Sequence, residues 1–248
     1  MVQLSKRLQA LADMVTPGRT VADVGCDHGF VSIYLIQSGI APKVFAMDVR
    51  KGPLERAQEH IRDYNLTGQI ETRLSDGLTA MQPGEADALV CAGMGGPLMI
   101  KILTEGKAVA DKMQELILQP QSELQQFRQF LREHSLTIVE EKMILEEGKF
   151  YPMMRVQKAD VSGTEGLSAA KSQPAGMDAD TWQRLCDKFG PLLLPAKDET
   201  LKQYLLFQLH ICEEILERMK AGSSDKIEAK RNEVLSEIED IHLAIKQM

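Results

Sequence analysis

The chain has 248 residues, 44% of them hydrophobic and 26% charged, which is enough apolar material to bury a sizeable core. Its 29 Lys and Arg residues stand against 36 Asp and Glu residues, a net charge of −7, and neither the part up to Gln157 nor the rest has the basic excess expected of a nucleic-acid binder. The chain has no membrane-length apolar run, no signal-peptide layout and no paired cysteine spacing, which argues against membrane-embedded and disulfide-stapled classes and leads us to expect a cytoplasmic protein.

Strand-like and helix-like segments alternate along the first 157 residues. Apolar residues step by four and three positions between Leu4 and Val15, which predicts a helix. The strands expected after it are residues 20–24, 43–47, 70–74, 86–91 and 116–118, and the helices expected between and after them cover 30–38, 52–65, a segment from 97, and 122–134. This alternation predicts a doubly wound parallel sheet in an α/β fold.

Two further strands break the alternation. Residues 137–145 and 150–156 flank Glu146-Glu147-Gly148-Lys149, which is too short for a helix and is typical of a hairpin turn. A parallel sheet that ends in an antiparallel hairpin is the outline of a seven-stranded, Rossmann-like class I methyltransferase, whereas a plain dinucleotide-binding fold lacks the hairpin.

The C-terminal part has a different composition. Residues 158–180 are rich in Gly, Ser, Ala and Asp and are expected to form a linker or mobile loop between a first domain, 1–157, and a helical domain, 181–248. Apolar residues then repeat at alternating steps of four and three, which predicts an antiparallel, coiled-coil-like hairpin of two helices. The pattern leaves open whether this hairpin is a self-packing stalk, a dimer contact or an arm that holds RNA.

Glycines and carboxylates follow four of the expected strands. The segment Asp23-Val24-Gly25-Cys26-Asp27-His28-Gly29 allows a sharp turn close to a ligand, and its carboxylates suit a ligand with an amino group, such as S-adenosylmethionine, better than a pyrophosphate. Asp48 ends the second strand, where an acidic residue binds ribose hydroxyls. Asp76-Gly77 and Gly93-Met94-Gly95-Gly96 follow the next two strands. Any one cluster could be a turn or a helix cap, but four at the same edge of a sheet predict a nucleoside cofactor site.

Other candidate residues have simpler alternative roles. Arg7 could clamp a carboxylate or phosphate, or lie exposed on its helix without a role. His28 could lie near the transferred methyl group, or be satisfied by Asp27 alone. Phe30 could stack on a base, although core packing is the simpler role. The remaining histidines lack metal-ligand spacing, so no metal site is predicted: His60, His134, His210 and His242.

At these motifs the chain resembles the bacterial tRNA (adenine-22, N1)-methyltransferases, which are class I S-adenosylmethionine-dependent enzymes. The resemblance covers roughly residues 1–157 and rests, in order, on Leu4-Ser5-Lys6-Arg7-Leu8, DVGCDHGF, Gly52-Pro53, Asp76-Gly77-Leu78, Ala92-Gly93-Met94-Gly95-Gly96, Leu116-Ile117-Leu118-Gln119-Pro120-Gln121 and EEGKFY. It implies methyl transfer to N1 of adenine 22 in tRNA, and a C-terminal coiled-coil-like domain.

The resemblance also assigns residues by position. It implies that Asp23, Gly25 and Asp27 surround the methionine part of S-adenosylmethionine, that Asp48 holds the ribose, and that Asp76 and Gly77 lie near the adenine. The full cofactor-binding set expected is Arg7, Asp23, Gly25, Cys26, Asp27, Asp48, Val49, Asp76, Gly77, Ala92, Gly93, Met94 and Gly95, with Arg7 and Phe30 expected to bind substrate. The chain departs from the family pattern, which often has Ser at Cys26, Tyr at Phe30 and Asn at Gln121.

The chemistry expected at adenine N1 is simple. The neutral base already has a lone pair there, so catalysis can rest on positioning and on acceptors that stabilise the cationic product. Asp27, His28 and Gln119 are the candidates for that role. The base must also leave its stack, because N1 lies on the pairing edge. Ala-Gly-Met-Gly replaces the Asn-Pro-Pro-aromatic motif of amino-methyltransferases, which favours a ring-nitrogen target.

Three alternatives stay open at this stage. A small-molecule methyltransferase on the same fold would suit the acidic charge. A non-catalytic scaffold would bind the cofactor and assemble through the helical hairpin. An NAD-linked dehydrogenase fits less well, because Asp27 disfavours a pyrophosphate and the hairpin ending is wrong for it. The leading prediction has tRNA as its partner and no membrane or metal, and protein partners stay unknown from the sequence.

Overall fold

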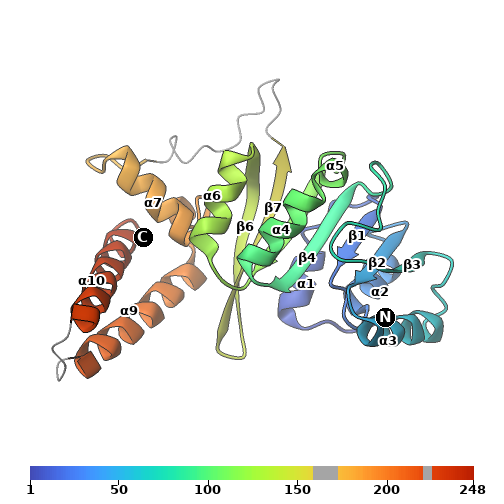
Figure 1. Ribbon diagram of the computed structural model, residues 1–248, viewed down its shortest axis with the longest axis horizontal. Coiled ribbons are helices and arrows are strands. Elements are labelled where there is room, and N and C mark those ends of the chain that lie inside the picture. The colour runs from blue at the N-terminus through green and yellow to red at the C-terminus, as the bar shows by residue number, and fades with distance from the viewer. Residues whose placement is uncertain (159–172, 220–224) are drawn as a thin grey trace. The chain divides into compact units, whose positions relative to one another are not determined.

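The computed structural model describes residues 1–158, 173–219 and 225–248, and the chain divides into two compact units, Met1–Gly166 and Leu167–Met248 (Figure 1). Most of the expected linker, 158–180, lies outside the described residues. Of its described part, residues 173–178 form turns and irregular structure, and residues 179–180 already begin a helix.

The first unit is built on a seven-stranded sheet in the order β3-β2-β1-β4-β5-β7-β6. The first five strands in this order are parallel, β7 is antiparallel to β5, and β6 is antiparallel to β7. The strands are β1 (Val21–Val24), β2 (Val44–Asp48), β3 (Ile70–Leu74), β4 (Ala88–Met94), β5 (Glu115–Pro120), β6 (Leu136–Glu146) and β7 (Lys149–Lys158). The predicted doubly wound sheet with an antiparallel hairpin is therefore confirmed.

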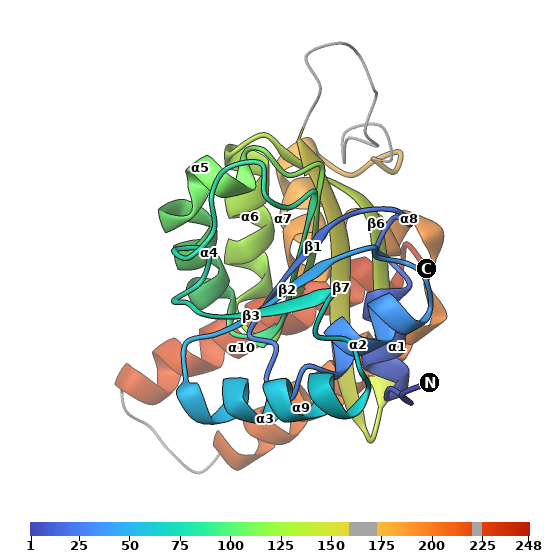
Figure 2. The same ribbon diagram turned by 90° about the vertical axis from the view of Figure 1, so that its right-hand side faces the viewer.

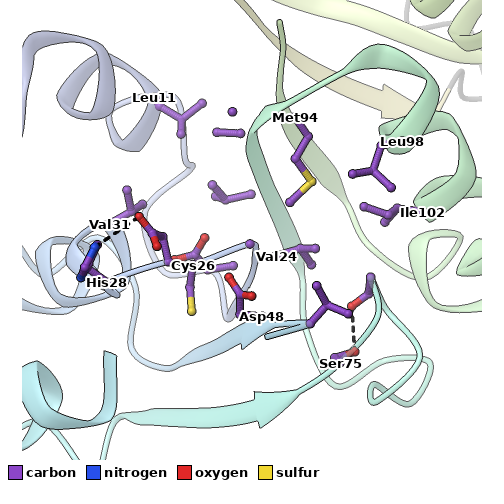
Figure 3. Close-up of a pocket in the computed structure, with 18 of the residues that line it drawn as sticks. Leu11, Val24, Cys26, His28, Val31, Asp48, Ser75, Met94, Leu98 and Ile102 are labelled. Carbon is purple, nitrogen blue, oxygen red and sulfur yellow. Dashed lines mark hydrogen bonds and ion pairs between the residues drawn. The ribbon is translucent and has the colours of Figure 1, made fainter. Parts of the chain in front are cut away.

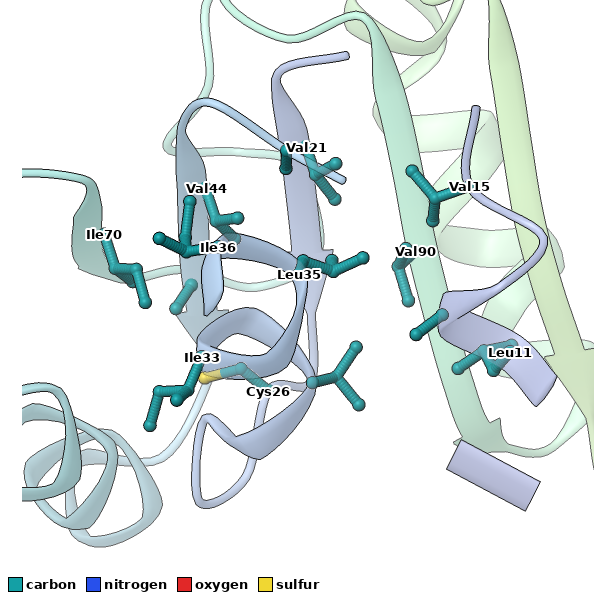
Figure 4. Close-up of a cluster of buried hydrophobic side chains, with 14 of the residues drawn as sticks. Leu11, Val15, Val21, Cys26, Ile33, Leu35, Ile36, Val44, Ile70 and Val90 are labelled. Atoms are coloured by element: carbon teal, nitrogen blue, oxygen red, sulfur yellow. The ribbon is translucent and has the colours of Figure 1, made fainter. Parts of the chain in front are cut away.

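Helices cover both faces of this sheet (Figure 2). One face carries α1 (Lys6–Ala12), α2 (Phe30–Gln37) and α3 (Lys51–Asp63), and the other carries α4 (Gly96–Glu105), α5 (Lys107–Ala110) and α6 (Leu124–Glu133). Because β1, β2 and β5 are buried along their whole length, their sequences are mostly apolar and show no polar alternation. The exceptions are buried polar residues: Asp23, Asp48, Glu115 and Gln119. Figure 4 shows Val21 and Val44 of the sheet packed with Ile33, Leu35 and Ile36 of α2.

The fourth strand is longer than expected. It continues three residues past Cys91, and Ala92 and Met94 pair with Gln119 and Pro120 while Gly93, at φ +79°, forms a bulge between them. The glycine cluster expected to be a turn is thus partly strand, because a bulge at glycine lets the ladder continue. This extension places Met94 at the edge of the sheet.

The hairpin turn between β6 and β7 is confirmed as predicted. Glu146 pairs with Lys149, and the two residues between them, Glu147 and Gly148, have φ of +48° and +74°. Two successive positive φ angles are the mark of a type I′ turn, whose twist matches that of antiparallel strands. The turn therefore brings β7 back along β6 and beside β5.

The second unit is helical. It comprises α7 (Ala179–Phe189), α8 (Leu193–Ala196), α9 (Glu199–Met219) and α10 (Asp225–Ile245), with α9 and α10 side by side and antiparallel (Figure 1). All positions of the two predicted seams are buried or half-buried: Leu205, Leu209, Cys212, Leu216 and Met219 in the first, and Ile227, Arg231, Val234, Ile238, Ile241, Ile245 and Met248 in the second. Nη2 of Arg231 donates to the carbonyl of Met219, 3.1 Å away, at the end of α9. The helical hairpin is confirmed, while its coiled-coil character stays a prediction. No helix of the described residues is long and apolar enough to span a membrane.

A buried carboxylate ties α7 to α10. Asp240 is 2% exposed and accepts hydrogen bonds from Arg184 Nη2 at 2.9 Å and from Lys188 Nζ at 2.6 Å. Burial alone would raise the pKa of Asp240, but these two bonds outweigh it and lower the pKa. The second unit therefore contains a buried carboxylate whose charge is stabilised only while it is paired with Arg184 and Lys188.

We expect Asp240→Asn to lower the free energy of unfolding of the second unit by about 2 kcal/mol, because charge-assisted hydrogen bonds to two cations are weakened. Trp182, the only tryptophan, lies in α7, so its fluorescence during urea unfolding reports on this unit. The exposed neighbour Glu239→Gln is the control and is expected to change stability little. Equal free energies of unfolding for both variants would show that the Asp240 ion pairs do not stabilise the second unit.

Candidate functional site

A cavity of about 600 Å³ opens where β1, β2, β3 and β4 end (Figure 3). Its position is that of ligand sites in open α/β sheets, and its volume is typical of small-molecule pockets. All predicted site residues line it except Gly95 and Gln119: Arg7, Asp23, Gly25, Cys26, Asp27, His28, Phe30, Asp48, Val49, Asp76, Gly77, Ala92, Gly93 and Met94. Leu98, Ile102 and Gln121 also line it.

The turn after β1 forms the centre of the cavity floor. Gly25 has φ +77°, and its N–H and that of Cys26 both donate to the carbonyl of Met47. A Cβ built at Gly25 would lie 2.2 Å from Cε of Met94, the flexible end of that side chain, so it is the positive φ that favours glycine at this position. At the end of the turn, a Cβ at Gly29 would lie 3.1 Å from Cβ of Ala57. The glycines thus leave room for a ligand above the turn and for α3 beside it.

Asp23 lies beneath this turn. It is 4% exposed, and its Oδ2 accepts a 2.6 Å hydrogen bond from Ser32 Oγ of α2. Burial raises the pKa of Asp23 to about 6, and the charge of Asp48 adds to that rise, although the bonds from Ser32 oppose it. Burial disfavours the charged form of Asp23. A buried carboxylate in a cavity wall is a candidate for binding a cationic group, which would stabilise that charge.

Asp48 ends β2 and is 5% exposed. Its Oδ1 accepts a 2.8 Å hydrogen bond from the backbone N–H of Arg50, which fixes the carboxylate at the cavity wall. This geometry suits a carboxylate that accepts hydrogen bonds from vicinal hydroxyl groups.

Asp27 and His28 lie at the exposed end of the turn. Asp27 has φ +49°, its Oδ2 is 3.6 Å from Nε2 of His28, and the side chains are 60% and 39% exposed. Both line the cavity, so both can contact a ligand there.

Three rings gather beside this turn. The Phe30 ring is stacked with His60 at 4.6 Å between centroids, and His28 stands 6.0 Å from Phe30. Nδ1 of His60 lies 2.9 Å from the carbonyl oxygen of His28, so His60 supports the turn from α3. The sequence predicts no site role for His60, because it lacks metal-ligand spacing, and its contact with His28, 32 residues away, has no local signal in the sequence.

Arg7 reaches the cavity from α1 and is held from three strands. Its Nη1 donates to Gln119 Oε1 at 2.8 Å, its guanidinium lies 4.9 Å from the Tyr151 ring centroid, and its backbone N–H donates to Glu146 Oε1 at 3.0 Å. Gln119 is fully buried, so it contacts Arg7 and not the cavity. The other predicted residue outside the lining, Gly95, precedes α4, where a Cβ would lie 3.0 Å from Ser122 Oγ.

The far end of the cavity has apolar and polar walls. Leu98 and Ile102 of α4 lie opposite the Asp48 side in Figure 3. At the end of β3, Ser75 Oγ donates to the carbonyl of Gly77 at 2.8 Å, and Asp76 lies 3.5 Å from Lys101 Nζ. Such walls suit a flat apolar ring with a few polar edge groups.

The thiols in and beside the cavity are not nucleophiles: Cys26 lines the cavity, and Cys91 of β4 lies in the chain between the lining residues Val90 and Ala92. Burial raises the pKa of Cys26, which is 8% exposed, and nearby Asp23, Asp48 and Asp27 add to the rise. Burial likewise raises the pKa of Cys91 to about 12. Both stay protonated at neutral pH. Within residues 1–158, 173–219 and 225–248, no group of three or more His, Cys, Asp or Glu side chains is placed to hold a metal ion.

Comparison with known proteins places this geometry in a family. Residues 4–154 match the model of a methyltransferase domain, a segment that includes every residue lining the cavity. The chain is 32% identical over 176 residues to the tRNA (adenine(22)-N(1))-methyltransferase of Bacillus subtilis, covering 71% of this chain and 74% of that protein. The chain belongs to the tRNA (adenine-22, N1)-methyltransferase family.

Solved structures of tRNA (adenine-22, N1)-methyltransferases agree with this membership over nearly the whole chain. The B. subtilis m1A22 tRNA methyltransferase TrmK is 28% identical, with a TM-score of 0.83, covering 99% of this chain and all of that one. Sp1610 of Streptococcus pneumoniae, in complex with S-adenosyl-L-methionine, is 27% identical, with a TM-score of 0.81, covering 98% of this chain and all of that one. The alignments therefore include the helical second unit.

The cavity residues fit S-adenosylmethionine as the family's cofactor. Buried Asp48 supplies acceptors for ribose hydroxyls, Gly25 leaves its backbone open, and Leu98 and Ile102 offer an apolar wall for an adenine ring. The acidic lining formed by Asp23, Asp27 and Asp48 suits a ligand with amino and sulfonium cations and disfavours a pyrophosphate.

Proposed function

We propose that the protein transfers a methyl group from S-adenosylmethionine to N1 of adenine 22 in tRNA. The observation that carries the proposal is that the segment matching the methyltransferase model contains the whole cavity, in a chain 32% identical to a tRNA (adenine(22)-N(1))-methyltransferase. The cytoplasmic location expected from the sequence belongs to the same proposal.

Cofactor binding is assigned to the turns at the ends of β1, β2 and β3. Asp48 accepts from the ribose hydroxyls, Asp23 and Asp27 face the methionine part, and Asp76 with Gly77 lies near the adenine. S-adenosylmethionine, when bound, supplies a methyl group on a sulfonium. The supporting feature is that these carboxylates converge on one cavity from three strands.

Catalysis is assigned to positioning and to electrostatics. Adenine N1 attacks with a lone pair of the neutral base, so no side chain has to remove a proton first. Asp27 and His28, exposed at the mouth, would face the positive charge that the base acquires, and Phe30 would stack on it with His60 behind. Gln119 contributes by holding Arg7, so its proposed role is positioning.

The test uses purified protein, radiolabelled S-adenosylmethionine, and two unmodified tRNAs that differ only in the base at position 22. We expect label on the tRNA with adenine at that position and none on the other. Label on neither tRNA, with cofactor binding confirmed by calorimetry, would overturn the tRNA assignment and favour a small-molecule methyltransferase or a scaffold.

A further inference from the structure

The side-chain carboxamide of Gln121 lies at the mouth of the cavity and is available to bind a ligand. Its backbone N–H donates to the carbonyl of Met94 at 2.8 Å, so the residue is anchored where β4 and β5 end. The side chain is exposed and lines the cavity, and across the described part of the chain it takes part in no hydrogen bond. Gln119, two residues earlier, is by contrast fully buried and bonded to Arg7.

The side chain of Gln121 lies next to the backbone of Gly93, which carries no side chain. Gly93 is exposed, and a Cβ built on it would lie 3.8 Å from Nε2 of Gln121, so the absence of a side chain there leaves open space next to the carboxamide. This space lies on the β4 side of the cavity, whereas the Asp48 and Asp76 carboxylates proposed for the cofactor end β2 and follow β3. A target base in this space would therefore contact Gln121 and lie away from Asp48 and Asp76.

Resting on the proposed function, we propose that Gln121 selects the target adenine by hydrogen bonds to its N6 and N7. A carboxamide offers one acceptor and one donor side by side, which match the N6 amino group and N7 of adenine. Pairing on that edge leaves the N1 lone pair free for attack. Pairing with N6 and N1 would instead occupy the nucleophile.

The same contact rejects guanine. Guanine presents O6 and N7, both acceptors, so Oε1 of Gln121 would face another acceptor without a hydrogen. Adenine is then selected over guanine because guanine leaves Oε1 of Gln121 without a hydrogen bond, and no steric clash is required. Gln121 is thus a specificity-determining residue for the reaction.

The experiment compares Gln121→Leu with Gln125→Leu, the same chemical change on an exposed residue of α6 outside the cavity lining. Each variant is assayed on tRNA carrying adenine or 7-deazaadenine at position 22, and S-adenosylhomocysteine binding is measured by calorimetry. We expect Gln121→Leu to lower kcat/KM on adenine about 10- to 50-fold with cofactor affinity unchanged, while Gln125→Leu behaves as the wild type.

The assay with 7-deazaadenine tests the hydrogen bond between Gln121 and N7 by itself. The wild type should prefer adenine to 7-deazaadenine about 10-fold, and Gln121→Leu should lose that preference, since the variant has already lost the hydrogen bond to N7 that the modified base removes. Retention of the preference in Gln121→Leu, or an equal loss of cofactor affinity, would overturn the inference. Failure of the wild type itself to methylate adenine 22, with cofactor binding intact, would overturn the proposed function as well.

Discussion

Replacing Asp48 with asparagine is expected to weaken the binding of S-adenosylmethionine and S-adenosylhomocysteine about 100-fold. Asparagine keeps the shape of the side chain and the acceptor for the Arg50 N–H, but removes the charge that strengthens hydrogen bonds from two ribose hydroxyls. Hydrogen bonds to a buried charged group contribute about 1.5–3 kcal/mol each, and losing most of one such contribution accounts for the expected factor.

The measurement is calorimetric titration with S-adenosylhomocysteine, and thermal unfolding of the ligand-free protein checks that the fold survives. Asp63→Asn, an exposed aspartate at the end of α3, is the matched control and should bind as the wild type does. Because Asp48 also raises the pKa of Asp23, the variant should lower that pKa slightly and cost no stability at neutral pH. An affinity within threefold of the wild type would remove the ribose role from Asp48.

The features predicted correctly from the sequence are those set by local pattern and by topology. Mostly apolar runs at 21–24 and 44–48 indicate strands covered on both faces, and parallel strands must end at one edge of the sheet. Residues directly after those strands therefore meet, whatever the angles of the connecting helices. That reasoning was enough to place Asp48, Asp76 and the Gly25 turn at one cavity.

The positions of Gln119 and Gln121 could not be predicted in the same way. A strand expected to end at Leu118 makes Gln119 the first residue of a loop at the sheet edge. The ladder in fact continues to Pro120, because the bulge at Gly93 keeps β4 paired with β5. Gln119 is therefore inside the sheet and Gln121 reaches the mouth, a difference decided by the partner strand and not by the residues themselves.

Contacts at the site between residues far apart along the chain could not be predicted from the sequence either. Arg7 is held by Gln119, Glu146 and Tyr151, which lie more than 110 residues away along the chain, and His60 supports Phe30 from a different helix. The segment EEGKFY stood out only as a motif. The structure shows that its first and last residues hold Arg7 at the cavity, a role that needs the hairpin to pack against α1.

Asp23→Asn is expected to change the pH dependence of stability by about 3 kcal/mol. The folded-state pKa of Asp23, about 6, lies above its ordinary value of 3.8, because the carboxyl is buried. The folded state thus favours the protonated form, so this carboxyl supports the fold fully below about pH 4, and that support is lost as the pH rises through about 6. Each pKa unit corresponds to about 1.4 kcal/mol, which gives the expected magnitude.

The expected result is a difference in unfolding free energy between variant and wild type that moves in favour of the variant between about pH 4 and about pH 8, whatever constant offset the amide introduces. Hydrogen exchange of the β1, β2 and β4 amides in urea, followed by mass spectrometry, measures the first unit, and the Trp182 transition of the second unit serves as an internal control that should not move between variant and wild type. A difference that stays flat with pH would show that Asp23 is not destabilised by burial. If the variant is more stable above pH 6 but binds S-adenosylhomocysteine more weakly, then the protein keeps at Asp23 a buried charge that destabilises the fold, because the cofactor's cationic amino group needs it.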